Sequence, residues 1–207
     1  ETKKIENNIE LFPEYRLAYN EKTITIHNGR KKRWRAQQEA LYTFHLPEGS
    51  AISSLSLWVN GVERKSRLTT KKKASGAYNN IVGVQMRDPA IAHWKEGNRV
   101  TVKVFPCTPA EDRVFKIGIT SPLLFNDGEL IYSDTYLEGP ILNRAQVFSN
   151  IHINGETKNI SVPFNYNKIE QNHYQYSGGF SNELFITMDG PKLSKNAFCF
   201  NGNCYSI

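Results

Sequence analysis

The stretch ISSLSLWVNG, residues 52–61, alternates apolar and polar side chains and ends in an Asn-Gly pair. Successive side chains of a strand point to opposite faces. Leu55, Leu57 and Val59 therefore share one face, and Ser54, Ser56 and Trp58 share the other. An Asn-Gly pair accepts the positive φ angles of a two-residue hairpin turn. The stretch therefore predicts a half-buried strand, a tight turn at Asn60-Gly61 and a returning strand over Val62–Leu68.

The same turn chemistry recurs along the whole chain. Of the 14 Gly in 207 residues, 6 directly follow Asn or Asp, whereas Met, a good helix former, occurs only 2 times. Aromatic residues make up 12% of the chain, which argues against disorder. This composition predicts a mainly β fold and excludes a helical bundle, a coiled coil and a fibrous chain. The six glycines are Gly29, Gly61, Gly128, Gly155, Gly190 and Gly202.

Changes of pattern divide the chain into three predicted parts. Residues 1–22 are polar with scattered apolar positions and predict an extended N-terminal lead-in. Residues 23–125 predict a first module of strands, and residues 126–207 predict a β-rich extension that packs on this module or completes it. Short aromatic strands of the extension are expected at residues 130–136, 147–153, 160–164, 173–176 and 183–188.

One short packed helix is expected at about residues 70–86. Ala74, Tyr78 and Ile81 fall at helical spacing and form one apolar stripe. Asp88-Pro89 must end this helix, because the residue before a proline avoids the helical region.

The C-terminal cysteines have the spacing of a hairpin. Cys199 and Cys204 flank Phe-Asn-Gly-Asn, in which Asn201-Gly202 fits a two-residue turn. Such a turn places the two cysteines opposite each other, with Cα atoms about 4.5 Å apart, which is within reach of a disulfide. We expect a cross-strand disulfide there, and two reduced thiols in a cytosolic hairpin are the alternative. Cys107 has no partner nearby in the sequence and is expected to be a small buried hydrophobe.

Positive charge is concentrated in the first half of the chain. The net charge is +6, and residues 1–105 hold 19 Lys and Arg against 10 Asp and Glu, whereas the remainder holds 7 against 10. Strand alternation sends neighbouring cations to opposite faces and the second half is acidic, so nucleic acid is not the expected partner. A basic surface that faces a protein or a membrane headgroup is favoured. Its candidate residues are Arg30, Lys31, Lys32, Arg33, Arg35, Lys71, Lys72 and Lys73.

The sequence contains no recognisable catalytic, metal-binding or cofactor-binding motif. The five His are dispersed, without metal-ligand spacing to a Cys or an acid. A phosphate-binding loop and a nucleophile elbow are both absent from the sequence. Residues far apart in the sequence could form one nucleophilic site, in which Cys107 lies beside His45 or His93. We expect a protein that is not an enzyme and that needs no cofactor.

Three blocks of the first half carry a family resemblance. The sequence QEALYTFHLPEGSAI, residues 38–52, has an acidic residue before Ala, a Tyr-x-Phe strand and then Leu-Pro-Glu-Gly. Ala77-Tyr78 with Ile81, then Arg87–Ile91, and finally the strand Asn98–Pro106 follow in order. Residues 38–125 thereby resemble the VIT domain, the vault protein inter-alpha-trypsin module. Cys107-Thr108-Pro109 departs from the Ile-Pro-Pro that is usual in that family.

The resemblance implies that residues 23–125 form a β-sandwich-like module with one packed helix. It also implies a scaffolding or interaction role, without family catalytic residues to carry over. The part after residue 125 lacks the Asp-x-Ser-x-Ser metal site of the von Willebrand type A domain that usually follows a VIT domain. It is more similar to bacterial VIT proteins associated with exosortase-type sorting, which are larger membrane proteins. We therefore expect a domain of a membrane-anchored cell-envelope protein, located in the periplasm or at the cell surface. A cytoplasmic location is the alternative.

Membrane contact is expected only through segments outside this chain. No run reaches the roughly 18 apolar residues of a membrane span, and the first residue is Glu1 rather than Met, which suggests a portion of a longer protein. The sequence identifies neither a protein partner nor an oligomeric state. The alternative function is a module that binds carbohydrate or another surface polymer. Its platform would consist of Trp34, Trp58, Trp94, Tyr174 and Tyr176.

Overall fold

A computed structural model describes residues 1–29, 38–66, 90–190, 197–200 and 203–206, the last two ranges by their backbone only. Its fold is mainly β, as the sequence predicts. The helix expected at about residues 70–86 lies outside the described residues, and so do the cations at 30–35 and 71–73.

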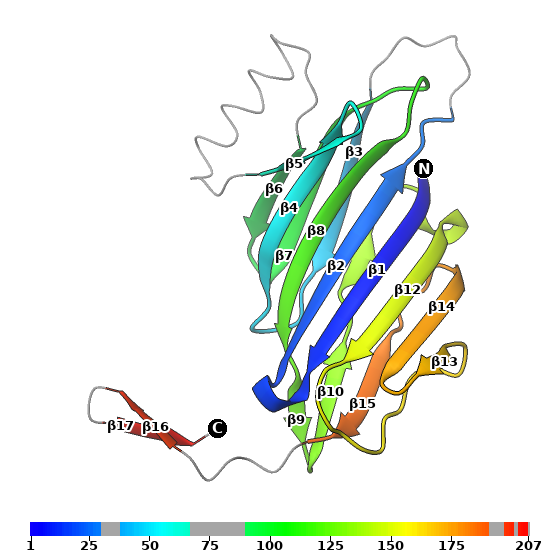
Figure 1. The fold of residues 1–207 in the computed structure, drawn as a ribbon. Coiled ribbons are helices and arrows are strands. Elements are labelled where there is room, and N and C mark those ends of the chain that lie inside the picture. Colours follow the sequence, from blue (N-terminus) through cyan, green and yellow to red (C-terminus); the bar gives the residue numbers. More distant parts are fainter. Residues whose placement is uncertain (30–37, 67–89, 191–196, 201–202, 207) are drawn as a thin grey trace.

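One sheet of eight strands forms the front layer in Figure 1. All of its ladders are antiparallel except the one between β1 and β12, which run parallel. Its order is β13 (Asn167–Glu170), β14 (His173–Gly179), β12 (Gln146–Ile153), β1 (Thr2–Phe12), β2 (Leu17–Ile26), β8 (Arg113–Pro122), β4 (Ala51–Val59) and β5 (Val62–Lys65).

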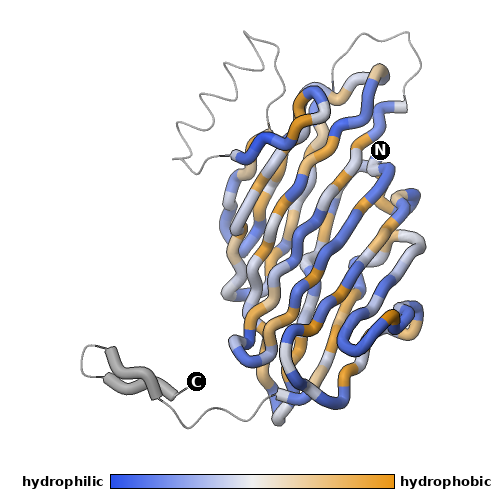
Figure 2. Tube along the Cα trace, viewed as in Figure 1, coloured by the Kyte–Doolittle hydropathy of each residue, from blue (hydrophilic) through white to orange (hydrophobic). Residues whose placement is uncertain are grey.

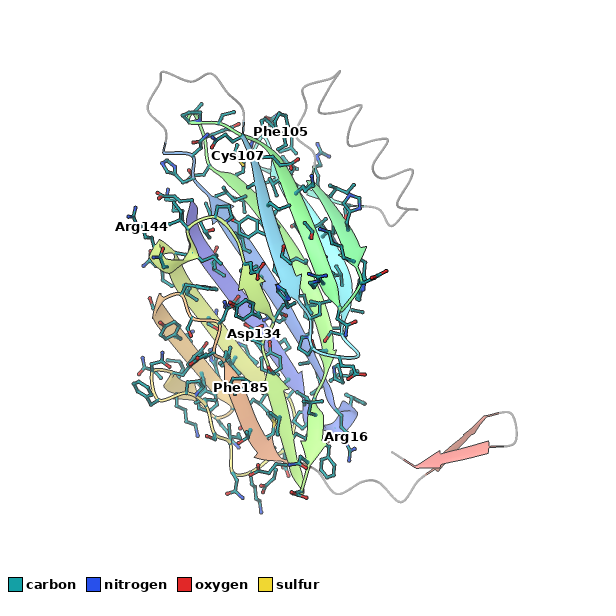
Figure 3. The ribbon with its side chains drawn as sticks, turned by 180° about the vertical axis from the view of Figure 1, so that it is seen from behind. Arg16, Phe105, Cys107, Asp134, Arg144 and Phe185 are labelled. Atoms are coloured by element: carbon teal, nitrogen blue, oxygen red, sulfur yellow. The ribbon has the colours of Figure 1, made fainter. Side chains whose placement is uncertain are left out.

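Two smaller sheets cover one face of the large sheet (Figures 1 and 3). The four-stranded sheet has the order β11 (Tyr136–Glu138), β3 (Gln38–His45), β7 (Arg99–Cys107) and β6 (Ala90–Lys95). The three-stranded sheet has the order β15 (Phe185–Asp189), β10 (Glu129–Ser133) and β9 (Leu124–Asn126). A separate hairpin pairs β16 (Ala197–Phe200) with β17 (Asn203–Ser206), and the short 3-10 helices η1 (Pro13–Tyr15) and η3 (Leu142–Arg144) lie in connections.

Two of the predicted turns are tight hairpin loops. Asn60 and Gly61 have φ angles of 51° and 74° between β4 and β5, and Asp127 and Gly128 have φ angles of 48° and 89° between β9 and β10. Positive φ at both central residues is the geometry that matches the twist of the flanking strands, which explains why these pairs decide the local register. Residues 160–164, by contrast, do not form the expected strand, since only Ser161 makes an isolated bridge, to Thr187.

Each smaller sheet packs on the large sheet through its own apolar cluster. The first cluster joins β3 and β7 to β4, β8 and the N-terminal part of β1, with Tyr42, Phe44 and Phe115 fully buried. The second joins β10 and β15 to β12, β14 and the C-terminal part of β1, with Leu130, Ile151 and Met188 fully buried. Figure 2 shows the alternation of apolar and polar residues along the strands that produces these one-sided cores.

Residues 1–22 are extended, as expected, but they are not a lead-in. β1 lies between β2 and β12 in the middle of the large sheet, and its Ile5, Ile9 and Leu11 are buried. The prediction is wrong because polar residues such as Asn7 interrupt the inward apolar pattern. Ladders also cross the expected boundary at residue 125, since β11 pairs with β3 and β12 pairs with β1. The division into domains at that point remains a prediction.

Close packing of Tyr42 on Gly139 gives a first test of the core. A Cβ at Gly139 would overlap the Tyr42 ring, which cannot withdraw because it is buried against Phe115 at 5.1 Å between ring centroids. We predict that Gly139→Ala lowers the free energy of unfolding by about 1–3 kcal/mol, the usual cost of overpacking. Urea unfolding measures it. Gly179→Ala is the matched control, because a Cβ there meets nothing within 4 Å, and equal effects of the two substitutions would contradict the packing argument.

Asp112 gives a second test, of acid stability. Burial alone would raise the pKa of Asp112, but hydrogen bonds from Lys3 and His27, both at 2.7 Å, outweigh it and hold the pKa below its ordinary value. A lowered pKa adds stability above the unfolded pKa, about 3.9, and this stability is lost as the pH falls through the folded pKa. We predict that Asp112→Asn is destabilising at neutral pH and that its difference from wild type shrinks towards pH 2. A difference that is independent of pH would refute this role.

Candidate functional site

A stripe of buried polar side chains crosses the inner face of the large sheet and separates the two apolar clusters. Asn7 on β1 is directly opposite Lys22 on β2 and directly opposite Ser149 on β12. Asn7, Lys22 and Ser149 are 6%, 4% and 1% exposed. Inward positions in the middle of a sheet are normally apolar, so this stripe needs polar partners.

Lys22 finds these partners in one carboxylate and one amide. Its Nζ donates to Asp134 Oδ2 at 2.6 Å and to Asn7 Oδ1 at 3.1 Å. Asp134 follows β10, and its other oxygen accepts hydrogen bonds from Asn20 Nδ2 at 2.9 Å and from the Thr135 backbone N–H at 2.7 Å. The carboxylate is thereby fixed in position beside the amine. Figure 3 labels Asp134 between the sheets.

Two phenols complete this polar cluster. Burial raises the pKa of Tyr132 well above its ordinary value and raises that of Tyr166 to about 12. Tyr132 therefore remains protonated at neutral pH and donates to Asp134 Oδ1 at 3.2 Å. The cluster thus contains a primary amine in contact with both a carboxamide and a carboxylate, which is an arrangement capable of proton transfer.

Exposed apolar residues gather at one end of the molecule, around Arg16. Tyr15 is 70% exposed, Leu17 42%, Leu124 54% and Phe125 48%. The Leu123 N–H donates to the Arg16 carbonyl oxygen at 2.8 Å, which brings β9 against η1. The Arg16 guanidinium carbon lies 4.2 Å from the centroid of the Phe125 ring. We call these five residues, Tyr15, Arg16, Leu17, Leu124 and Phe125, the Arg16 tip, which Figure 3 shows at the lower end of the molecule.

The backbone of Arg16 has a left-handed conformation, which is unfavourable for residues other than glycine. Its φ is 51°, in the left-handed region that glycine adopts most cheaply. Its buried Nε and Nη2 atoms have no hydrogen-bond acceptor among the residues that the structure describes. These two atoms form the edge of the guanidinium that pairs with a carboxylate. Arg16 therefore places a positive charge beside an apolar surface, with two buried donors that have no partner among the described residues.

A polar hollow of about 470 Å³ lies beside β13 and β14. A second hollow of about 530 Å³ adjoins it and shares Thr157, Lys158, Gln171 and Asn172. The lining of the first hollow consists mainly of amides, hydroxyls and two lysines, with Tyr174 beneath. We call it the β13–β14 hollow and define it by Lys158, Asn159, Lys168, Gln171 and Asn172.

The sequence-predicted cysteines fall in the expected elements. Cys199 on β16 is directly opposite Cys204 on β17, and Phe200 is opposite Asn203, so the predicted register is confirmed and the disulfide itself stays a prediction. Cys107 is a free thiol that is 5% exposed, and burial raises its pKa. His45 pairs with Arg99 at the opposite end of β7, so Cys107 and His45 do not meet.

The proposed aromatic platform does not assemble from its described members. Trp58 lies on β4 of the large sheet, where Lys116 Nζ is 5.7 Å from its ring centroid, whereas Trp94 lies on β6 of another sheet. Tyr174 is buried, and Tyr176 packs against the first apolar cluster. Trp34 lies outside the described residues. Within the described parts of the chain, no three His, Cys, Asp or Glu side chains gather to hold a metal ion.

Sequence reasoning missed the Lys22 cluster and the Arg16 tip. A signal for the first was present, because Lys22 is in phase with the buried Ile24 and Ile26 of the same strand and must therefore point inward. The second depends on a contact between residues 16 and 125, which no local pattern reveals.

Comparisons with solved structures give distant similarities. Native yeast leukotriene A4 hydrolase has a TM-score of 0.46 and 8% identity, over 93% of this chain and 29% of that chain. An M1 zinc metallopeptidase from Deinococcus radiodurans has a TM-score of 0.47 and 9% identity, over 100% of this chain and 46% of that chain. The chain thus spans less than half the length of these two proteins. No curated protein matches the sequence.

Among the described residues, no helix is long and apolar enough to cross a membrane.

A family match identifies the first half of the chain. The family model described as the vault protein inter-alpha-trypsin domain matches residues 14–119. This match begins within η1, before the residue 23 at which the sequence analysis placed the start of the module, and it includes β2 to β7 and most of β8. Since it covers more than half of the 207 residues, the chain belongs to the VIT domain family.

Proposed function

We propose that this chain is a non-enzymatic protein-interaction domain that binds an extended, partly acidic segment of a partner protein at the Arg16 tip. The observation that carries the proposal is the gathering of four large exposed apolar side chains around the Arg16 guanidinium. Aromatic residues and Arg are enriched at protein interfaces, where a buried Arg commonly pairs with a carboxylate.

The position of β9 supports an extended partner. β9 pairs with β10 and forms the edge of its sheet in the described structure, so a further strand can add to it. Leu124 and Phe125 on this edge would contact apolar side chains of the added strand, and Arg16 would bind an acidic one. An uncovered apolar edge without a partner would favour aggregation.

The setting of the domain is part of the same proposal. A larger, membrane-anchored protein of the bacterial cell envelope, of the exosortase-associated type, would present the domain outside the cytoplasm. The opposed Cys199 and Cys204 support this setting, because a disulfide persists in an oxidising compartment.

Site-specific photo-cross-linking tests the tip. A photoreactive residue at position 124 in the full-length protein should give discrete protein adducts, whereas the same residue at Asn8, an exposed position on β1, should not. Arg16→Gly should lower the affinity for the captured partner about tenfold or more, because it removes the guanidinium while suiting the positive φ. Equal adducts at both positions, or an unchanged affinity of Arg16→Gly, would refute binding at the tip.

A second candidate function is the binding of an acidic surface polysaccharide in the β13–β14 hollow. Lys158 and Lys168 have no ion-pair partner in the part of the chain that the structure describes, and amides of Asn159, Gln171 and Asn172 surround them. Amides and lysines bind hydroxyl and carboxylate groups, so the lining suits a uronic-acid polymer.

Affinity electrophoresis through a gel that contains polygalacturonate tests this candidate. Joint substitution of Lys158 and Lys168 by Gln should abolish the retardation, because both cations of the hollow are lost. Joint substitution of the exposed Lys65 and Lys95 by Gln makes the same change of net charge elsewhere and should leave the retardation intact. If the retardation falls equally in both variants, net charge alone causes it and the hollow is not the binding site. An absence of retardation in wild type would exclude the candidate.

A further inference from the structure

The Lys22 cluster holds the reactants of an amide-forming reaction. Lys22 and Asn7 are directly opposed on adjacent strands, and the Lys22 amine touches the Asn7 carboxamide oxygen at 3.1 Å. The Asp134 carboxylate lies 2.6 Å from the same amine. Asn7 and Lys22 are buried between the two apolar clusters, and the side chain of Asp134 is 11% exposed.

We propose that Lys22 and Asn7 form an intramolecular isopeptide bond and that Asp134 is the catalytic residue that moves the protons. Two facts about the site favour the reaction over a lasting ion pair. Proximity on a rigid sheet supplies the orientation that an uncatalysed amidation lacks. The register of the sheet also holds the buried Lys22 amine in contact with the buried Asn7 carboxamide.

The steps balance without an oxidant or a second reactant. Asp134 takes one proton from Lys22 Nζ, and the free electron pair of Nζ then forms a bond to Asn7 Cγ. A second Nζ proton passes to Asn7 Nδ2, and the Cγ–Nδ2 bond breaks with its electron pair on nitrogen. Asp134 returns its proton to the departing ammonia, which leaves as ammonium. The product is one secondary amide, Asp134 is regenerated, and nothing is oxidised or reduced.

The surroundings of Asp134 suit this exchange of protons. Hydrogen bonds from Asn20, from Tyr132 and from the Thr135 backbone all go to Oδ1, so Oδ2 is the oxygen that faces the amine. An exposed ion pair between a lysine and a carboxylate on the same sheet lacks this environment. Lys4 on β1 pairs with Glu6 at 2.7 Å, and both of these side chains are more than a third exposed. Lys4 is therefore the matched control.

The intact mass of the purified, fully reduced 207-residue chain tests the bond. We expect a mass lower by about 17 Da than the sequence requires, because ammonia is lost, and a digest that contains one peptide linking Lys22 to Asn7. Lys22→Arg, Asn7→Ala and Asp134→Ala should each have the full mass, whereas Lys4→Arg should retain the loss.

Two results would overturn the proposal. The first is a folded wild-type chain with its full mass, a result that does not depend on the folding of any variant. The second is a mass loss that disappears with hydroxylamine and maps to an Asn-Gly pair such as Asn154-Gly155, because cyclisation of Asn also releases ammonia.

Discussion

The hydrogen bonds on the two sides of β1 hold the structure together. On one side β1 pairs with β2, its neighbour in the chain, and on the other it pairs in parallel with β12, which begins at residue 146. Without β1 the large sheet would separate into β2-β8-β4-β5 and β12-β14-β13, each with one of the two apolar clusters. A parallel pair requires a long connection between its strands, and here that connection contains the whole family-matched module.

The polar stripe explains how such a sheet keeps its register. A shift of one residue turns every side chain of a strand to the opposite face. Before the proposed bond forms, such a shift of β1 would move Asn7 to the solvent and leave the charge of Lys22 buried without its amide partner. A buried ion pair contributes little net stability, but an unpaired buried charge is strongly unfavourable. The stripe thus acts mainly against wrong pairings, while Ile5, Ile9 and Leu11 supply the apolar burial on the same strand.

Local sequence chemistry predicts much of this fold. The alternation in residues 52–59 and the Asn-Gly and Asp-Gly turns correctly indicate β4, β5 and β10, because both signals act within a few residues. The central position of β1 is not predictable in this way, since Asn7, Asn20 and Lys22 break the apolar pattern and find their partners only in the folded structure. The Arg16 tip escapes prediction for the same reason. Its surface exists because a backbone hydrogen bond of Leu123 brings two distant segments together.

The direction of the strands has a mechanical consequence. The His27 N–H donates to the Glu1 carbonyl oxygen at the end of the molecule where β1 begins. β15, in the three-stranded sheet, ends at the opposite end, where the Gly190 N–H donates to the Gly128 carbonyl oxygen (Figure 1). Tension applied between residues 1 and 190 would therefore run along the strands. The ladders on both sides of β1 would be loaded in shear, many hydrogen bonds at once, instead of opening one by one like a zipper. A domain with this geometry is suited to bear force between two attachments.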